Sequence, residues 1–156
     1  LLPAGQMRRR FPFDLWILIG SALVIADVMT SSGAAKLIAD YTSSVLSPFG
    51  VMGAFVSVYL MTWLLTELVT NSAAAALAFP IAVSSAAQYD AAALPFVLAV
   101  AFAASSGFLI PTGYQTHMMV MSPGRYRTMD FIRKGTPMAI LYGLICIVFI
   151  PLFFPF

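Results

Sequence analysis

The chain has 156 residues, of which 61% are hydrophobic and only 9% charged, and its formal net charge is +2. A soluble domain carries about 25% charged residues, so this chain has too few charges to cover a surface that faces water. The composition excludes an ordinary soluble protein and predicts an all-α integral membrane protein that is surrounded by lipid.

The first apolar segment covers residues 13–30 and follows a basic cluster at residues 8–10. Because cytoplasmic flanks of membrane spans are enriched in Lys and Arg, we expect this end of the span to be cytoplasmic. Residues 31–47 are more polar, and their apolar side chains suit one face of a short helix at the membrane interface. The chain begins with Leu1 and lacks a signal-peptide pattern, so we expect the upstream part of a longer protein to be missing.

A predicted hairpin covers residues 48–87, in which two apolar runs enclose the polar residues 66–72. Two interpretations fit this pattern: two full spans joined by a polar turn, or a re-entrant hairpin whose tip lies inside the membrane. A cytoplasmic turn should carry Lys, Arg, Gly or Pro, and this one has none of them. Its Thr, Asn, Ser and Glu residues suit the lining of a cavity, which favours the re-entrant hairpin.

The next apolar segment, over residues 91–121, is interrupted at residues 105–107 and again at residues 111–116. Pro and Gly residues so close together break a helix. Broken backbone at membrane depth is tolerated where it is buried in protein or lines a cavity. The pattern therefore predicts a discontinuous helix whose second half restarts near His117.

A polar, basic connection at residues 125–134 precedes a last apolar run at residues 137–156, which is long enough for one span. From the cytoplasm the chain first crosses the membrane outward. The hairpin then returns to its own side, and the broken helix crosses back. This order places the connection at residues 125–134 in the cytoplasm. Both basic clusters then lie on the same side. We treat residues 1–156 as a single transmembrane domain.

The interruptions at residues 66–72 and 111–116 are the candidate sites. Unpaired N–H groups at the start of a helix suit an anion, and unpaired carbonyls at the end of a helix suit a small cation. Transporters place pairs of such breaks near the bilayer midplane. Thr70 and Ser72 are natural N-caps, and Asn71 offers both a carbonyl oxygen and N–H donors. The alternative is that these residues only cap helices or bond neighbouring helices.

Two titratable residues lie in or beside these interruptions. Glu67 is the acid within the deep apolar stretches, and it could balance a cation or hold the hairpin by a hydrogen bond. His117, the only histidine, could donate to an anion, titrate near neutral pH, or pack in a hydrogen-bonded role. The chain lacks a second His, a close pair of acids, a phosphate loop and a metal-ligand pattern, so we predict that it is not an enzyme.

The sequence TELVTNSA at residues 66–73, followed by FPI at residues 79–81, resembles the hairpin signature of the divalent-anion:sodium symporter family. These are the sodium/sulfate and sodium/dicarboxylate transporters. The stretch IPTGYQTHMMV at residues 110–120 resembles the broken helix that follows the second hairpin of that family. The resemblance covers nearly the whole chain and corresponds to the C-terminal one of two inverted repeats. It implies a missing N-terminal half of the same protein and a homodimer.

The resemblance also implies a cation site. Thr66, Asn71 and the backbone of Gly113 fall where the family holds a sodium ion. Sodium is therefore the expected coupling ion, and no other metal or cofactor is expected.

The resemblance further implies an anion site. Thr70, Asn71 and Ser72 fall on the triplet that binds the carboxylate or sulfate of the substrate, and Thr116 and His117 are expected to line the same site. His117 stands where the family usually has Asn, which leaves the substrate and the coupling ion open.

The predicted function is sodium-coupled uptake of a divalent anion, sulfate or a di- or tricarboxylate, by a multi-pass protein of the bacterial inner membrane. A proton-coupled carrier or antiporter of the same superfamily is one alternative, and a membrane subunit that does not transport is another. Nucleic acid is excluded as a partner, because the basic residues do not spread over a polar face.

Overall fold

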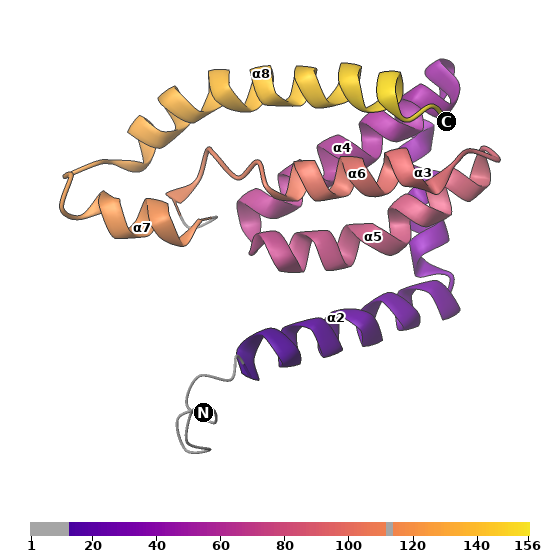
Figure 1. The fold of residues 1–156 in the computed structure, drawn as a ribbon, viewed down its shortest axis with the longest axis horizontal. Helices are drawn as coiled ribbons and strands as arrows, with labels where there is room; N and C mark the ends of the chain where they lie inside the picture. The colour runs from indigo at the N-terminus through magenta and orange to yellow at the C-terminus, as the bar shows by residue number, and fades with distance from the viewer. Residues whose placement is uncertain (1–12, 112–113) are drawn as a thin grey trace, which may run out of the picture.

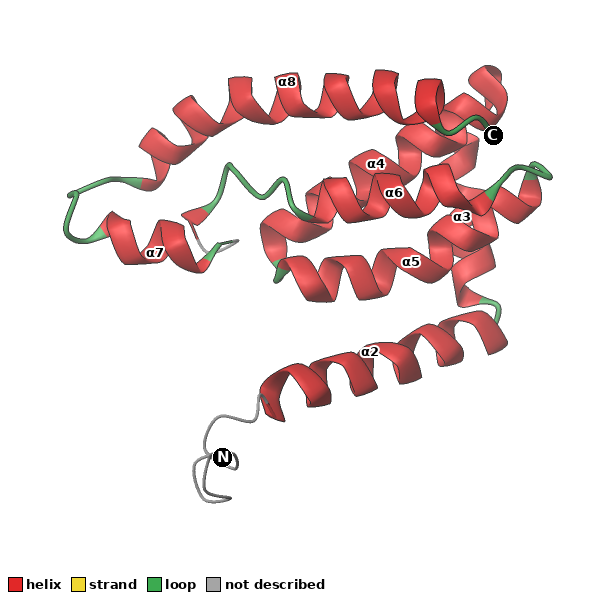
Figure 2. Ribbon diagram, in the orientation of Figure 1, coloured by secondary structure: helices red, strands yellow, loops and turns green. Residues whose placement is uncertain are grey.

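The computed structural model describes residues 13–111 and 114–156, and the regular structure in these two ranges is entirely helical, as predicted (Figure 2). In chain order the elements are α2 (Phe13–Ser31), α3 (Ala34–Val45), the short 3-10 helix η1 (Ser47–Phe49), α4 (Gly50–Leu68), α5 (Asn71–Gln88), α6 (Ala93–Ala104), α7 (Gln115–Met121) and α8 (Thr128–Phe153). The basic cluster at residues 8–10 lies outside the described residues, so its cytoplasmic location stays a prediction.

The centre of the molecule consists of α4, α5 and α6, which pack against one another (Figure 1). The buried face of α5 carries alanines spaced one helical turn apart: Ala74, Ala78, Ala82 and Ala86. Such small side chains allow the backbones of neighbouring helices to approach closely, as is common in membranes. Phe55 of α4 and Phe96 of α6 are fully buried and meet edge to face, with ring centroids 5.9 Å apart. This packing brings the C-terminal ends of α4 and α6 and the N-terminal end of α5 close together.

The turn between α4 and α5 is short and locally determined. The last backbone bond of α4 runs from the Val69 N–H to the Leu65 carbonyl, and Val69 then adopts an extended conformation. Thr70 caps the following helix, and its hydroxyl oxygen accepts a hydrogen bond of 3.3 Å from the Ala73 N–H. The predicted cap at Thr70 is therefore confirmed. The helix itself begins at Asn71, within the polar residues 66–72.

The two predicted interruptions of the second broken helix form one segment. No α-helix is present in the described residues between Ala104, which ends α6, and Gln115, which begins α7. The predicted restart near His117 is thus two residues late. The N–H groups of residues 108–110 bond to the Glu67 side chain of α4, and the Phe108 N–H also bonds to the Ser106 carbonyl at 2.9 Å. None of these is the bond of an α-helix, so the apolar residues 108–110 lie outside helix.

Helix α8 begins at Thr128, nine residues before the predicted start of the last span. The cause is a local cap: the Asp130 carboxylate accepts a hydrogen bond of 2.8 Å from the Arg127 N–H, which closes the first turn. Most of the predicted basic connection is therefore helical. The 26 residues of α8 correspond to about 39 Å of helix.

Several helices are long and apolar enough to cross a membrane. In the described residues these are α4 and α8, and a third candidate exists if α2 and α3, which meet at 75°, count as one bent span. Helix α3 occupies the segment predicted as a short interfacial helix. Large apolar side chains cover the outer faces of α2 and α8, among them Leu23, Val28, Leu141, Leu144 and Phe149. A surface of this kind suits hydrocarbon rather than water.

Candidate functional site

A cluster of three oxygen atoms joins the hairpin tip to the end of α6. The Thr66 Oγ1 lies 2.8 Å from the Asn71 Oδ1 and 2.6 Å from the Ala104 carbonyl oxygen, and Thr66 is fully buried. A hydroxyl group carries only one proton, so both acceptors depend on the same donor. The cluster therefore has more lone pairs than protons, which is an arrangement that a small cation can satisfy.

The end of α6 explains why one of these oxygens is a backbone carbonyl. Its preceding carbonyls bond locally, because Ser105 and Ser106 fold back on the last turn through their N–H groups and hydroxyls. Ala104 instead accepts from Thr66, 38 residues away in the sequence. The carbonyl end of a helix carries partial negative charge, so this end of α6 adds to the attraction for a cation.

The opposite polarity lies at the start of α5. The Ala73 N–H bonds to the Thr70 hydroxyl, and the Ala74 N–H bonds to the Thr70 carbonyl. The N–H groups of Asn71 and Ser72 precede these bonds and have no acceptor within the helix. Thr70 and Ser72 are exposed and Asn71 is half-buried, so this helix start is open to a ligand. Ser72 lies in the first turn, and the prediction that it caps the helix is wrong.

Glu67 is a buried carboxylate, 5% exposed, that the tip directs at the segment between α6 and α7. Its Oε1 accepts hydrogen bonds from the N–H groups of Phe108 at 3.0 Å and Leu109 at 3.1 Å. Its Oε2 accepts from Leu109 at 3.2 Å and from Ile110 at 2.9 Å. Of the two predicted roles for Glu67, these bonds support the one in which it holds the hairpin rather than balances a cation.

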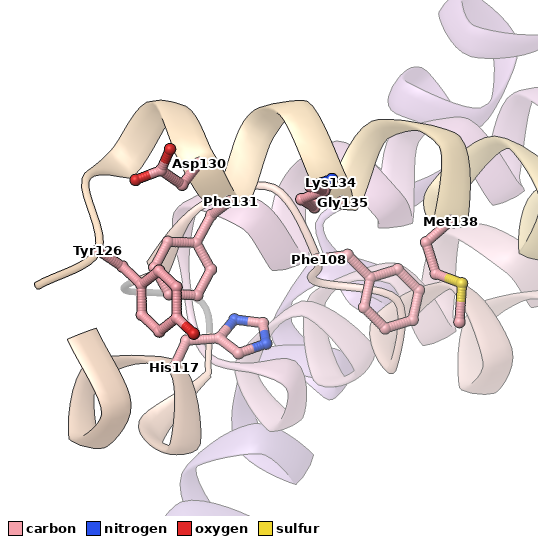
Figure 3. A pocket seen from close by; sticks show the side chains of 8 residues that line it. All are labelled: Phe108, His117, Tyr126, Asp130, Phe131, Lys134, Gly135 and Met138. Carbon is pink, nitrogen blue, oxygen red and sulfur yellow. The ribbon is translucent and has the colours of Figure 1, made fainter. Parts of the chain in front are cut away.

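The structure places His117 in a cavity of about 530 Å³ between α7 and α8 (Figure 3). Its ring contacts the rings of Tyr114 and Phe131, with centroid distances of 5.7 Å and 5.3 Å, and its Nδ1 is buried without a hydrogen-bond partner among the described residues. The described residues that line this cavity include none from the hairpin tip. The ring contacts support packing of His117, but its buried Nδ1 has no hydrogen-bond partner among the described residues, so the hydrogen bond of that role stays a prediction.

No described contact brings the other predicted site residues of the break between α6 and α7 to the hairpin tip at Val69 and Thr70. Thr116 is exposed on α7. Gly113 lies outside the described residues, so its backbone ligand stays a prediction. Sequence reasoning missed Ala104, whose carbonyl joins the oxygen cluster. Its signal was its position, since it is the last apolar residue before a helix break and therefore a helix end.

Comparison with known proteins supplies the family. The profile of the citrate transporter family matches residues 1–101. The chain belongs to the citrate transporter family. Among its curated relatives it is 34% identical to an uncharacterized transporter of Synechocystis sp. over 146 residues. It is 32% and 30% identical to sodium/sulfate cotransporters 1 and 2 of Chlamydomonas reinhardtii over 135 and 138 residues.

These matches cover most of the chain but a small part of each relative. They include 92%, 86% and 88% of this chain, and 23%, 15% and 16% of the respective relatives. The chain therefore spans about a quarter or less of their length. Membership of the citrate transporter family and the apolar helices confirm a multi-pass membrane protein of an anion transporter family.

Proposed function

We propose that the complete protein couples the entry of sodium to the uptake of a divalent anion, with sulfate as the first candidate. The observation that carries this proposal is the position of the Thr66 hydroxyl between the Asn71 amide oxygen and the Ala104 carbonyl. The names of the Chlamydomonas relatives support both sodium and sulfate.

Sodium would replace part of its hydration shell with these three oxygens. Thr66 and Asn71 come from the hairpin, and Ala104 comes from the end of α6, whose dipole favours positive charge. The carbonyl of Gly113 is the proposed further ligand. Because the ligands belong to two elements, a bound sodium ion would draw the hairpin tip and α6 together.

The anion would bind beside the cation, at the start of α5. The Thr70 and Ser72 hydroxyls and the first-turn N–H groups supply the donors, and the helix dipole favours negative charge there. Asn71 contributes to both sites because its amide has an oxygen on one side and an NH₂ group on the other. When the oxygen coordinates sodium, the NH₂ group faces away from the cation and can donate to the anion. One amide would thus couple the two substrates.

The larger architecture is part of the same proposal. The hairpin of α4 and α5 inserts as a re-entrant element, and the chain supplies the C-terminal one of two inverted repeats within one transmembrane domain. The N-terminal half supplies the matching hairpin, and two complete chains form a homodimer. Thr116 and His117 face the substrate path through movement of α7 or through contacts with that other half.

The test is uptake of labelled sulfate by the full-length transporter in proteoliposomes. Asn71→Ala should abolish sodium-dependent uptake because it removes the amide that both substrates share. Gln88→Ala, at the exposed far end of α5, is the matched control and should retain uptake. Uptake that a sodium gradient does not stimulate, but a proton gradient does, would contradict sodium coupling and favour the proton-coupled alternative.

A tricarboxylate is the second candidate substrate, because the matching family is described by citrate. An excess of unlabelled citrate in the same assay separates the two candidates. Strong competition, together with sodium-driven uptake of labelled citrate, would replace sulfate in the proposal and leave the site unchanged.

A further inference from the structure

We propose that Glu67 is a positioning residue that fixes the distance between the two helix breaks. It does so by binding the backbone of residues 108–110, which lead from the end of α6 into the second break. The inference rests on the proposed function, since it assigns to the two breaks one shared site.

Adjacent residues of α4 hold this segment at both ends. The Thr66 hydroxyl donates to the Ala104 carbonyl, where α6 stops. The Glu67 carboxylate accepts from the N–H groups of residues 108–110, before the chain reaches the buried Pro111. The turn in between therefore cannot move relative to the hairpin tip unless one of these two attachments breaks.

The charge of Glu67 makes its attachment strong. A buried carboxylate loses its hydrogen bonds to water, and donors in the protein must replace them. Here three consecutive N–H groups point at its two oxygens, and hydrogen bonds to a charged acceptor are about twice as strong as neutral ones. The requirement is mutual, because N–H groups shielded from water also need an acceptor. The Phe108 N–H has a second acceptor in the Ser106 carbonyl at 2.9 Å, whereas the N–H groups of Leu109 and Ile110 bond to Glu67.

Helix α8 holds the other side of the same segment. Gly135 lies directly against the carbonyl of Phe108, so closely that a Cβ atom on it would overlap that carbonyl. The N–H side of residues 108–110 thus faces Glu67, while the carbonyl side of Phe108 faces Gly135. The segment is clamped between two helices, and of these contacts those to Glu67 are hydrogen bonds.

Replacing the charge should loosen the segment without unfolding the helices. Glu67→Gln keeps the size of the side chain, but one of its two ends becomes an NH₂ donor facing N–H donors. The buried centre of α4, α5 and α6 does not involve this side chain. Loss of one charge-assisted bond corresponds to roughly a tenfold change in an equilibrium constant, so we expect a roughly tenfold higher KM for sodium and for the anion, with kcat little changed.

Two measurements on the full-length transporter test the proposal. Hydrogen–deuterium exchange should become faster in peptides that contain residues 108–110 of Glu67→Gln, and remain unchanged in peptides from the centre of α4 and α5. Uptake kinetics in proteoliposomes should show the higher KM. Asp90→Asn makes the same chemical change at an exposed acid in the turn after α5 and should alter neither. Glu67→Asp keeps the charge on a shorter side chain and should restore part of both.

The two measurements distinguish the hydrogen bonds of Glu67 to residues 108–110 from the effect of these bonds on transport. Unchanged exchange at residues 108–110 in Glu67→Gln, or in Glu67→Asp if the first variant does not fold, would overturn the proposal whatever the uptake shows. Faster exchange with unchanged KM values would make Glu67 a structural residue only and would also overturn it. If sodium fails to drive uptake by the unmodified transporter, the proposed function fails, and the positioning role would then have to appear in the KM of whichever ion drives uptake.

Discussion

The two helix breaks of this molecule differ in how their backbone groups are satisfied. Between α4 and α5 only Val69 and Thr70 interrupt the helices, and the cap comes from Thr70 itself. Between α6 and α7 the break covers the described residues 105–111 and 114, and a carboxylate from a different helix holds part of it. The first break is thus built locally, whereas the second depends on a partner more than 40 residues away in the sequence. A site that uses both breaks therefore has one side formed by the locally capped turn between α4 and α5. Its other side is the segment between α6 and α7, which a few specific hydrogen bonds hold in place.

We expect the largest loss of stability and uptake from a substitution at Thr66, which joins the two helix breaks. Thr66→Val keeps the shape of the side chain but removes the hydroxyl that serves both Asn71 and Ala104. Each buried acceptor left without a donor costs about 1–3 kcal/mol, so the free energy of unfolding should fall by about 2 kcal/mol or more. Sodium-dependent uptake should be lost. Chemical denaturation in detergent and the sulfate uptake assay measure the two effects.

The matched control for this prediction is Thr62→Val, one turn earlier on α4. Thr62 is also fully buried, but its hydroxyl donates to the Val58 carbonyl within the same helix. That carbonyl already accepts a backbone bond in a regular helix, so the loss should cost at most about 1 kcal/mol and leave uptake intact. Equal effects of the two substitutions would mean that Thr66 acts through burial alone.

An intermediate effect should come from the second break alone. Gly135→Ala places a Cβ atom against the Phe108 carbonyl and should push residues 108–110 away from α8. Overpacking of this kind costs about 1–3 kcal/mol. Gly20→Ala is the control, because no atom lies within 4 Å of its added Cβ, and Ala favours helix over Gly. Thermal unfolding should therefore occur at a lower temperature in Gly135→Ala and at an equal or higher one in Gly20→Ala.

The smallest effect should come from the first break alone. Thr70→Ala removes the N-cap of α5 and should lower the free energy of unfolding by about 1 kcal/mol. Ser72→Ala, in the first turn of the same helix, should change it by less than about 0.5 kcal/mol because its side chain is exposed. Both substitutions should raise the KM for the anion, since both remove a donor from the proposed anion site. An unchanged KM in both would exclude these hydroxyls from substrate binding.

The same difference between the breaks explains what the sequence could predict. The polar residues between two apolar runs and the Thr at the cap position are local signals, and the turn at Val69 and Thr70 lies inside the predicted residues 66–72. The sequence also predicted the interruptions at residues 105–107 and 111–116, but not that the apolar residues 108–110 between them lie outside helix, because such residues favour helix by themselves. Their N–H groups bond to Glu67 instead of continuing a helix, and the position of Glu67 beside them depends on the packing of α4 against α6.

Two further features depended on contacts that composition does not show. The early start of α8 follows from the bond between Arg127 and Asp130, which turns a polar connection into helix. The position of His117 follows from its contact with Phe131 on α8, the helix after its own. Sequence reasoning identified His117 as unusual, but its neighbours could be named only once α7 and α8 had been placed beside each other.

The alanine face of α5 has a consequence for movement. Helices that interlock through large side chains resist sliding along their common axis, because the rows of side chains on one helix would have to pass those on the other. A face of methyl groups at Ala74, Ala78, Ala82 and Ala86 is nearly smooth, so it offers close contact with little resistance to axial displacement. On this face, few side chains of α5 interlock with a neighbour, whereas Ile81 on another face packs against Ala35 and Ala39 of α3. A change in ligands at Asn71, the first residue of the helix, would be transmitted along its whole length as a small shift.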